Sequence, residues 1–205
     1  MNSYIALIRL DLLMLARNRA VIIFNYLFPL IFFFVFAGIF KLGGPTGGAP
    51  AQVLGMVLTL GMLGNGLYGA GMKMVQDREA GILRRYKVAP ISPQPLLVAS
   101  IVSGWAGYLP LVIGLTVLTH FRYGMAWPQR PITLLLLVLC GLAAFRALGL
   151  IIAAAANNTQ ESNALIQAIY MPCLLLSGAA VPLTVLPGWA ATVAKFLPAS
   201  YLVTG

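Results

Sequence analysis

Long runs without charge, separated by short polar segments, are the main pattern of this sequence. Asp, Glu, Lys and Arg are absent from residues 20–40, 42–72, 88–119 and 162–194, and Arg146 alone interrupts the stretch 131–160. A helix needs about 20 apolar residues to cross the hydrocarbon core of a membrane. Inside these runs apolar residues are continuous, as at 31–36, and do not alternate with polar ones as in membrane β-strands. The pattern therefore predicts an all-α membrane protein.

We expect residues 1–205 to form a single transmembrane domain, a polytopic bundle of five transmembrane helices. The expected spans are about residues 20–42, 52–75, 96–119, 132–156 and 164–181. Residues 1–19 mix apolar and charged side chains, which predicts a helix that lies at the membrane interface. Pro29 predicts a kink in the first span. Asn158, followed three residues later by Glu161, predicts an N-cap before the last span.

Composition and charge exclude a soluble or a disordered chain. Of the 205 residues, 60% are apolar and 8% are charged, against about 25% charged in a typical soluble domain. The formal net charge of +9 comes from Lys and Arg residues that flank the apolar runs, so the expected partner is membrane lipid and not nucleic acid. With a cytoplasmic N-terminus, the inner side carries Arg9, Arg17, Arg19, Lys73, Arg78, Arg84, Arg85 and Lys87, and the outer side Lys41, Arg122, Arg130 and Lys195. This bias predicts that orientation.

The sequence holds spans but no group that would supply energy or catalysis. No G-x-x-x-x-G-K-[ST] motif occurs, so the chain is expected neither to bind ATP nor to act as an enzyme. The one histidine, His120 at a span end, is too little for a metal site, and none is expected. The chain is therefore a passive channel, a secondary transporter, a structural subunit, or a transport subunit driven by a separate motor.

Small residues recur at a spacing of four in two of the expected spans. They lie at 61, 65 and 69 and again at 141, 149 and 153, with Phe145 interrupting the second set. This spacing favours close helix packing. The glycines at 64, 66 and 69 also spell G-x-G-x-x-G, but no strand precedes them, so packing is preferred over dinucleotide binding.

The polar segment at 76–94 concentrates charge on the expected inner side. Residues 79–88 predict a short amphipathic helix that ends before Pro90. The charges of this helix can pair with a cytoplasmic protein, and Ile82 and Leu83 can enter a groove on it. The alternative interpretation is a basic cluster that only fixes the topology.

Two motifs carry a family resemblance. Residues 78–92 are similar to R-E-x-G-T-x-x-R-L…P-[IV]-S, with matches at Arg78, Glu79, Gly81, Arg85, Pro90, Ile91 and Ser92. Residues 176–182, 186–189 and 197–201 are similar to L-S-G-x-x-x-P…L-P-x-W…L-P-x-x-Y. The chain thus resembles the type-2 ABC transporter permeases, the membrane subunits of bacterial export systems.

The resemblance implies an ATP-driven exporter of the bacterial inner membrane, in which this chain pairs with a second permease copy, identical or different. A separate nucleotide-binding ATPase subunit would hold ATP and Mg²⁺, and this chain would hold no cofactor. Contacts with the ATPase are expected from Asp77, Arg78, Glu79, Gly81, Leu83, Arg84, Arg85, Lys87 and Pro90. The resemblance also implies an outer re-entrant hairpin at 182–200, with Gly178, Pro182, Pro187, Trp189 and Pro198 in or beside it. The family has six spans, and we expect this chain to lack the sixth.

Arg146 is the one charge deep inside an expected span. It lies about ten residues, or roughly 15 Å, from the inner end of that span. A charge at this depth is unfavourable unless it meets protein, water or a lipid headgroup. Arg146 is therefore a candidate contact for substrate or lipid, and structural pairing or snorkelling of its side chain is the alternative.

Overall fold

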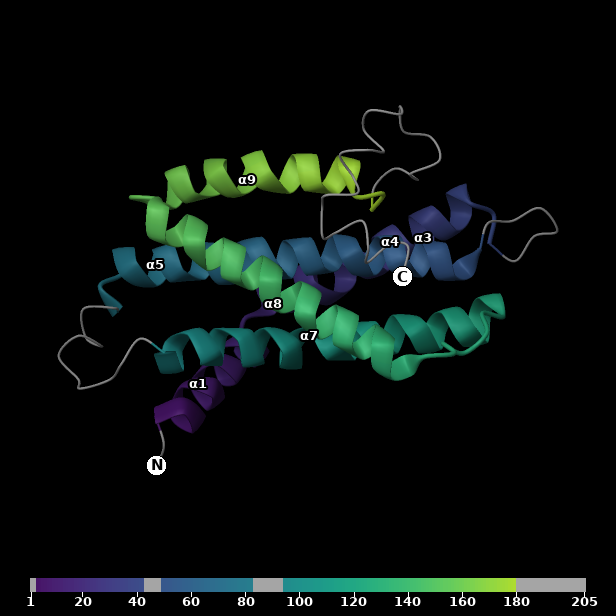
Figure 1. The fold of residues 1–205 in the computed structure, drawn as a ribbon, viewed down its shortest axis with the longest axis horizontal. Helices are drawn as coiled ribbons and strands as arrows, with labels where there is room; N and C mark the ends of the chain where they lie inside the picture. Colours follow the sequence, from purple (N-terminus) through teal and green to yellow (C-terminus); the bar gives the residue numbers. More distant parts are fainter. Residues whose placement is uncertain (1–2, 43–48, 83–93, 180–205) are drawn as a thin grey trace.

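The computed structural model describes residues 3–42, 49–82 and 94–179, and over these residues every regular element is a helix (Figure 1). The elements are α1 (Ser3–Arg17), α2 (Arg19–Ile22), η1 (Ile23–Leu27), α3 (Phe28–Ile39), α4 (Pro50–Leu63), η2 (Gly64–Met72), α5 (Lys73–Glu79), α7 (Gln94–Tyr123), α8 (Pro131–Ala155) and α9 (Thr159–Leu176). The segments η1 and η2 are π-helical. They join their neighbours into two longer helices, at 19–39 and 50–79.

Successive helices run back and forth between two ends of the molecule. Figure 1 shows the N-terminal end of α1, the end of α5, the start of α7 and the α8–α9 turn at one end. The start of α4, the end of α7 and the start of α8 lie at the other. This is the path of a chain that crosses a membrane several times.

Within the residues that the structure describes, three helices are long and apolar enough to cross a membrane, namely Pro50–Glu79, Gln94–Tyr123 and Pro131–Ala155. A shorter apolar helix covers Asn25–Ile39, and α9 covers most of the last expected span. The all-helical architecture is thus confirmed over the part of the chain that the structure describes, with several helices that could span a membrane. The count of five spans and the interfacial position of α1 stay predictions, and the hairpin at 182–200 lies outside the described residues.

Close contact between η2 and α8 depends on glycine. A methyl group on Gly66 would lie 2.4 Å from Cβ of Phe145, and one on Gly149 would lie 2.8 Å from the backbone oxygen of Leu67. Gly71 approaches the backbone of Gly149 equally closely, at 2.7 Å. The two backbones therefore pack at a distance that a side chain would prevent.

The glycines that make close helix contacts are only partly those of the expected four-residue spacing. Gly61 accommodates the hydroxyl of Tyr108 on α7, and Gly69 is exposed, whereas Gly66 and Gly71 meet α8. Gly66 and Gly71 both lie in the π-helical η2, where hydrogen bonds between residues five apart bring such residues near one face.

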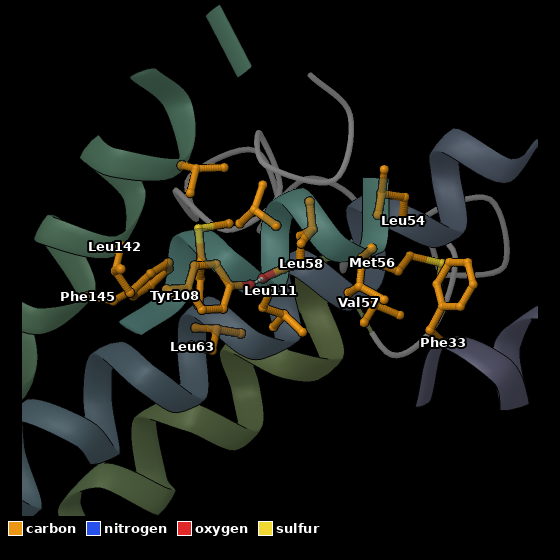
Figure 2. Close-up of a cluster of buried hydrophobic side chains, with 14 of the residues drawn as sticks. Phe33, Leu54, Met56, Val57, Leu58, Leu63, Tyr108, Leu111, Leu142 and Phe145 are labelled. Carbon is orange, nitrogen blue, oxygen red and sulfur yellow. Dashed lines mark hydrogen bonds between the residues drawn. The ribbon is translucent and has the colours of Figure 1, made fainter. Parts of the chain in front are cut away.

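The apolar core surrounds the helix at 50–79 (Figure 2). Tyr108 is fully buried there, and its hydroxyl donates a hydrogen bond to the backbone carbonyl of Leu58. A buried hydroxyl needs such a partner. Nearer the start of span one, Tyr26 donates to the carbonyl of Gly107 at 2.6 Å, so η1 is fixed to α7.

The first span is irregular close to the predicted position. Pro29 is buried in the first turn of α3, directly after the π-helical η1. Proline has no N–H to donate to the preceding turn, so the regular hydrogen-bond pattern is interrupted here.

The predicted N-cap of the last span is confirmed. Asn158 Oδ1 accepts from the N–H of Glu161 at 2.8 Å, and α9 begins at the next residue, Thr159. Glu161 Oε2 in turn accepts from the backbone N–H of Asn157 at 2.9 Å. This backbone hydrogen bond and one from the Asn157 side chain hold the pKa of Glu161 below its ordinary value.

The amphipathic helix expected from residue 79 does not begin there. Glu79 is the last residue of α5, and the chain turns at Ala80 and Gly81. Gly81 has a φ of +71°, a conformation that favours glycine and commonly ends helices. The prediction was wrong at this start because the sequence reading overlooked Gly81 as a helix stop. Residues 83–88 lie outside the described residues.

Candidate functional site

Arg78 joins the end of α5 to the end of α8. Its Nη1 donates to the backbone carbonyl of Ala153 at 3.1 Å, and its Nη2 donates to the carbonyl of Ala156. The last carbonyls of a helix have no partner within the helix and carry partial negative charge, so a guanidinium group is well suited to them.

Glu79, the next residue, binds the start of α9. Its Oε1 accepts from the N–H of Thr159 at 2.8 Å, and its Oε2 accepts from the Thr159 hydroxyl. The first N–H groups of a helix lack partners and carry partial positive charge, so a carboxylate is favourable there. Arg78 and Glu79 therefore hold the α8–α9 turn from both sides, and we call this pair the Arg78–Glu79 clamp.

Arg146 is 5% exposed and crosses from α8 to its neighbours. Its Nη1 donates to Asn65 Oδ1 on η2 at 2.7 Å, and its Nη2 donates to the Ser100 hydroxyl on α7 at 3.2 Å. A methyl group on Gly104 would lie 2.3 Å from Nη1, so that glycine makes room for the guanidinium group. Among the described residues, Nε has no hydrogen-bond partner.

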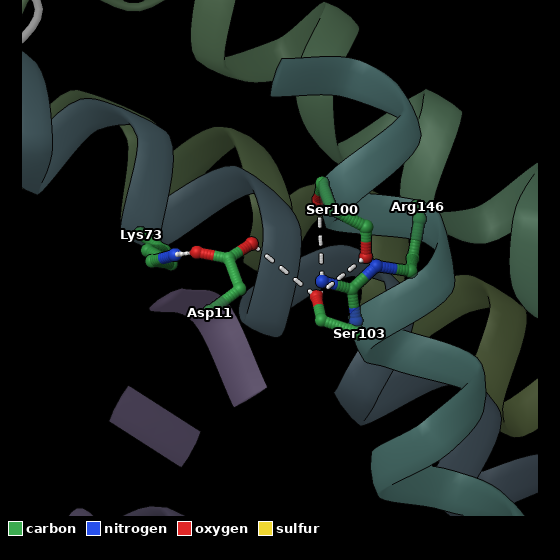
Figure 3. A network of polar contacts seen from close by, with 5 residues as sticks. All are labelled: Asp11, Lys73, Ser100, Ser103 and Arg146. Carbon is green, nitrogen blue, oxygen red and sulfur yellow. Dashed lines mark hydrogen bonds and ion pairs between the residues drawn. The ribbon is translucent and has the colours of Figure 1, made fainter. Parts of the chain in front are cut away.

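Beside Arg146 lies a second charged group, Asp11 of α1 (Figure 3). The Asp11 carboxylate forms an ion pair with Lys73 of α5 and accepts a hydrogen bond of 3.4 Å from the Ser103 hydroxyl of α7. Its side chain is only 12% exposed. Asp11 therefore ties α1 to two helices of the bundle.

These groups line a cavity of about 1030 Å³. Its polar lining includes Asp11, Lys73, Ser103 and Arg146, and its apolar lining includes Leu13, Met14, Phe28, Leu60 and Met72. The cavity thus has both charged and apolar side chains in its lining.

Comparison with known proteins adds the family. Residues 2–205 match the family described as ABC-2 type transporter. The chain belongs to this family. It is therefore a type-2 ABC permease, the transmembrane component of an ABC transporter, and as a transport component it is not itself catalytic. The chain matches no curated protein and no solved structure.

The structure places only part of the permease's expected coupling residues. Arg78 and Glu79 form the clamp, Gly81 ends α5 with its positive φ, and Asp77 is partly buried on α5. The others lie outside the described residues, namely Leu83, Arg84, Arg85, Lys87 and Pro90.

At the opposite end of the permease, α9 ends at Leu176 and Gly178 follows with a φ of +84°. The remaining hairpin residues Pro182, Pro187, Trp189 and Pro198 lie outside the described residues. No group of three or more His, Cys, Asp or Glu that could hold a metal ion occurs within 3–42, 49–82 and 94–179.

Sequence reasoning missed one member of this site. It assigned Asp11 to an interfacial helix, whereas the structure buries its carboxylate beside Lys73 and Ser103. The available signal was that Asp11 is the one acidic residue before Asp77 and stands between apolar residues at 10 and 12–16, a position typical of a charge that faces protein.

Proposed function

We propose that this permease is the transmembrane subunit of an ATP-driven export system in the bacterial inner membrane. A separate ATPase subunit supplies the energy and docks below the segment that follows α5. The chain works with a second permease copy, and its N-terminus is cytoplasmic. Family membership supports an ATPase partner, because permeases of this family typically work with one.

The Arg78–Glu79 clamp is the observation that carries the mechanical part of this proposal. Through its hydrogen bonds, a displacement of the end of α5 acts directly on the end of α8 and the start of α9. Movement of the adjoining segment by the ATPase would therefore reach three helices of the permease at one point. Alternating access needs this kind of joint displacement of packed helices.

The position of the clamp in the molecule agrees with a cytoplasmic N-terminus and a cytoplasmic ATPase. The clamp lies at the end of the molecule where α5 ends and α7 starts, and that is also the end with the N-terminal end of α1 (Figure 1). Lys73 and Arg78 lie near this end, which the positive-inside rule places in the cytoplasm.

Co-purification tests the proposal. The tagged permease is expressed with its genomic neighbours, and we expect a protein with a P-loop to be recovered with it. The Glu79→Ala, Arg84→Ala, Arg85→Ala triple variant should lose that partner, whereas Arg122→Ala at the far end of α7 should retain it. Uphill transport by vesicles that contain the permease alone would refute the proposal and favour a secondary transporter.

A further inference from the structure

The cavity beside Arg146 has the size of a ligand site. Its volume of about 1030 Å³ is at the upper end of the range of roughly 300–1,000 Å³ found for drug-sized ligands. It is bounded by residues of α1, η2, α7 and α8, which are far apart in the sequence.

The charges of the lining are unbalanced. Among the described lining residues, Arg17, Lys73 and Arg146 contribute three positive charges, and Asp11 contributes the one carboxylate. Within the described part of the chain the ion pair formed is Lys73–Asp11, so the carboxylate beside Arg146 is already engaged by Lys73 and Arg146 itself forms no ion pair. A buried cation whose neighbouring carboxylate is engaged by another cation is only partly compensated, and an anionic ligand would supply a counter-ion of its own.

Arg146 is also held in place before any ligand arrives. Asn65 and Ser100 accept from its two terminal nitrogens, Gly104 packs against it, and Nε is left without a partner in the described residues. A guanidinium group fixed in this way loses little freedom when it binds phosphate, sulfonate or carboxylate oxygens.

Apolar side chains cover much of the remaining wall, with Leu13 and Met14 from α1, Phe28 from α3, and Leu60 and Met72 from the helix at 50–79. These surfaces suit a hydrocarbon chain or an aromatic ring and not a wholly polar anion. We propose that the cavity binds one anionic amphiphile, with its charged group at Arg146 and its apolar part between α1 and the helix at 50–79. Binding of this ligand can be measured without transport. Only the later movement of the ligand across the membrane rests on the proposed function as an export permease.

Two matched pairs of probes test the site on the purified permease in neutral detergent. The first pair is palmitoyl lysophosphatidylglycerol and monopalmitoylglycerol, which share a chain and differ in charge. The second is 2-naphthalenesulfonate and its neutral sulfonamide. We expect the anion of at least one pair to bind at least tenfold more tightly than its neutral partner. Preference within the lipid pair assigns the site to membrane lipid, and preference within the naphthalene pair assigns it to a soluble cargo.

Arg146→Gln should remove this preference, with a loss of about 10- to 100-fold in affinity for the anion. Arg122→Gln is the matched control, because Arg122 is exposed at the end of α7 and does not line the cavity. Equal binding within both pairs, or a preference that survives in folded Arg146→Gln, would overturn the proposal.

A second variant tests the cavity without removing the charge. Gly69 lines the cavity, and a methyl group on it would lie no closer than 3.8 Å to Arg146 and Asn65, so Gly69→Leu has room for its Cβ and adds apolar volume to the lining. It should weaken the anion at least tenfold, and Gly38→Leu, on an exposed face of α3 with open space around it, should not. Unchanged binding in Gly69→Leu would overturn the proposal even if Arg146→Gln fails to fold. Neither result depends on an ATPase partner, so failure here leaves the co-purification test unaffected.

Discussion

Substitution of Arg78 by alanine is the most direct test of the Arg78–Glu79 clamp. The change removes two charge-assisted hydrogen bonds to the carbonyls of Ala153 and Ala156 at the end of α8. Hydrogen bonds to charged groups contribute about 1.5–3 kcal/mol each. Because Arg78 is partly exposed, solvent replaces some of this, and we expect a total loss of about 1–3 kcal/mol.

The assay combines thermal unfolding with hydrogen exchange. For a chain of about 200 residues, 1 kcal/mol corresponds to roughly 2–4 °C in Tm, so Arg78→Ala should lower Tm by about 2–12 °C. Amide exchange should rise most in residues 153–161, which form the end of α8 and the start of α9. Arg78→Lys retains the charge without the forked geometry of the guanidinium group, so its Tm and its exchange rates should lie between those of the wild type and Arg78→Ala.

The control is Arg122→Ala, since Arg122 is an exposed arginine at the other end of the bundle. It should leave both Tm and exchange at 153–161 nearly unchanged. If Arg78→Ala resembled this control, or if its added exchange were spread evenly over the helices, the clamp would not hold the α8–α9 turn.

Two further predictions concern packing and the tie to α1. Gly66→Ala should destabilise the protein by about 1–3 kcal/mol, because its methyl group would clash with Phe145. Thermal unfolding compares this variant with Gly38→Ala, whose methyl group meets open space. Equal Tm values for the two variants would contradict the prediction. Asp11→Asn should weaken the ion pair with its lysine on α5 and release α1, so trypsin should cleave faster between α1 and α2, and an unchanged cleavage rate would show that packing alone holds α1.

The helical architecture was predictable because it follows from local properties of the chain. Uncharged runs of about 20 residues leave few alternatives to membrane helices, and the Asn158 cap needs only two residues three positions apart. Helix boundaries were less predictable, since the end of α5 depends on Gly81 adopting a positive φ within a segment that otherwise favours helix.

The candidate functional site was less predictable, because its contacts join residues far apart in the sequence and no local pattern specifies them. Arg146 was identifiable as an unusual charge, but its partners Asn65 and Ser100 are 81 and 46 residues away in the sequence. Arg78 and Glu79 were identifiable from the family motif, but their contact with the α8–α9 turn was not. The motif indicated that these two residues matter for function, whereas their hydrogen-bond partners are seen only in the folded structure.

Two groups can be distinguished by some of the closest contacts among the described helices, and residues of both groups line the cavity. Arg78, Glu79 and the contacts of Gly66 and Gly71 join the helix at 50–79 to α8 and α9. In contrast, Tyr26 joins η1 to α7, and Leu15 of α1 packs on Gly107 of α7. Polar links between the groups include Lys73–Asp11, Arg146–Ser100 and Tyr108–Leu58. The clamp belongs to the first group only, so a force applied there displaces α8 and α9 together with the helix at 50–79. The displacement then falls on these links, of which the residues Lys73, Asp11 and Arg146 line the cavity, and that is where we expect a transport cycle to change access.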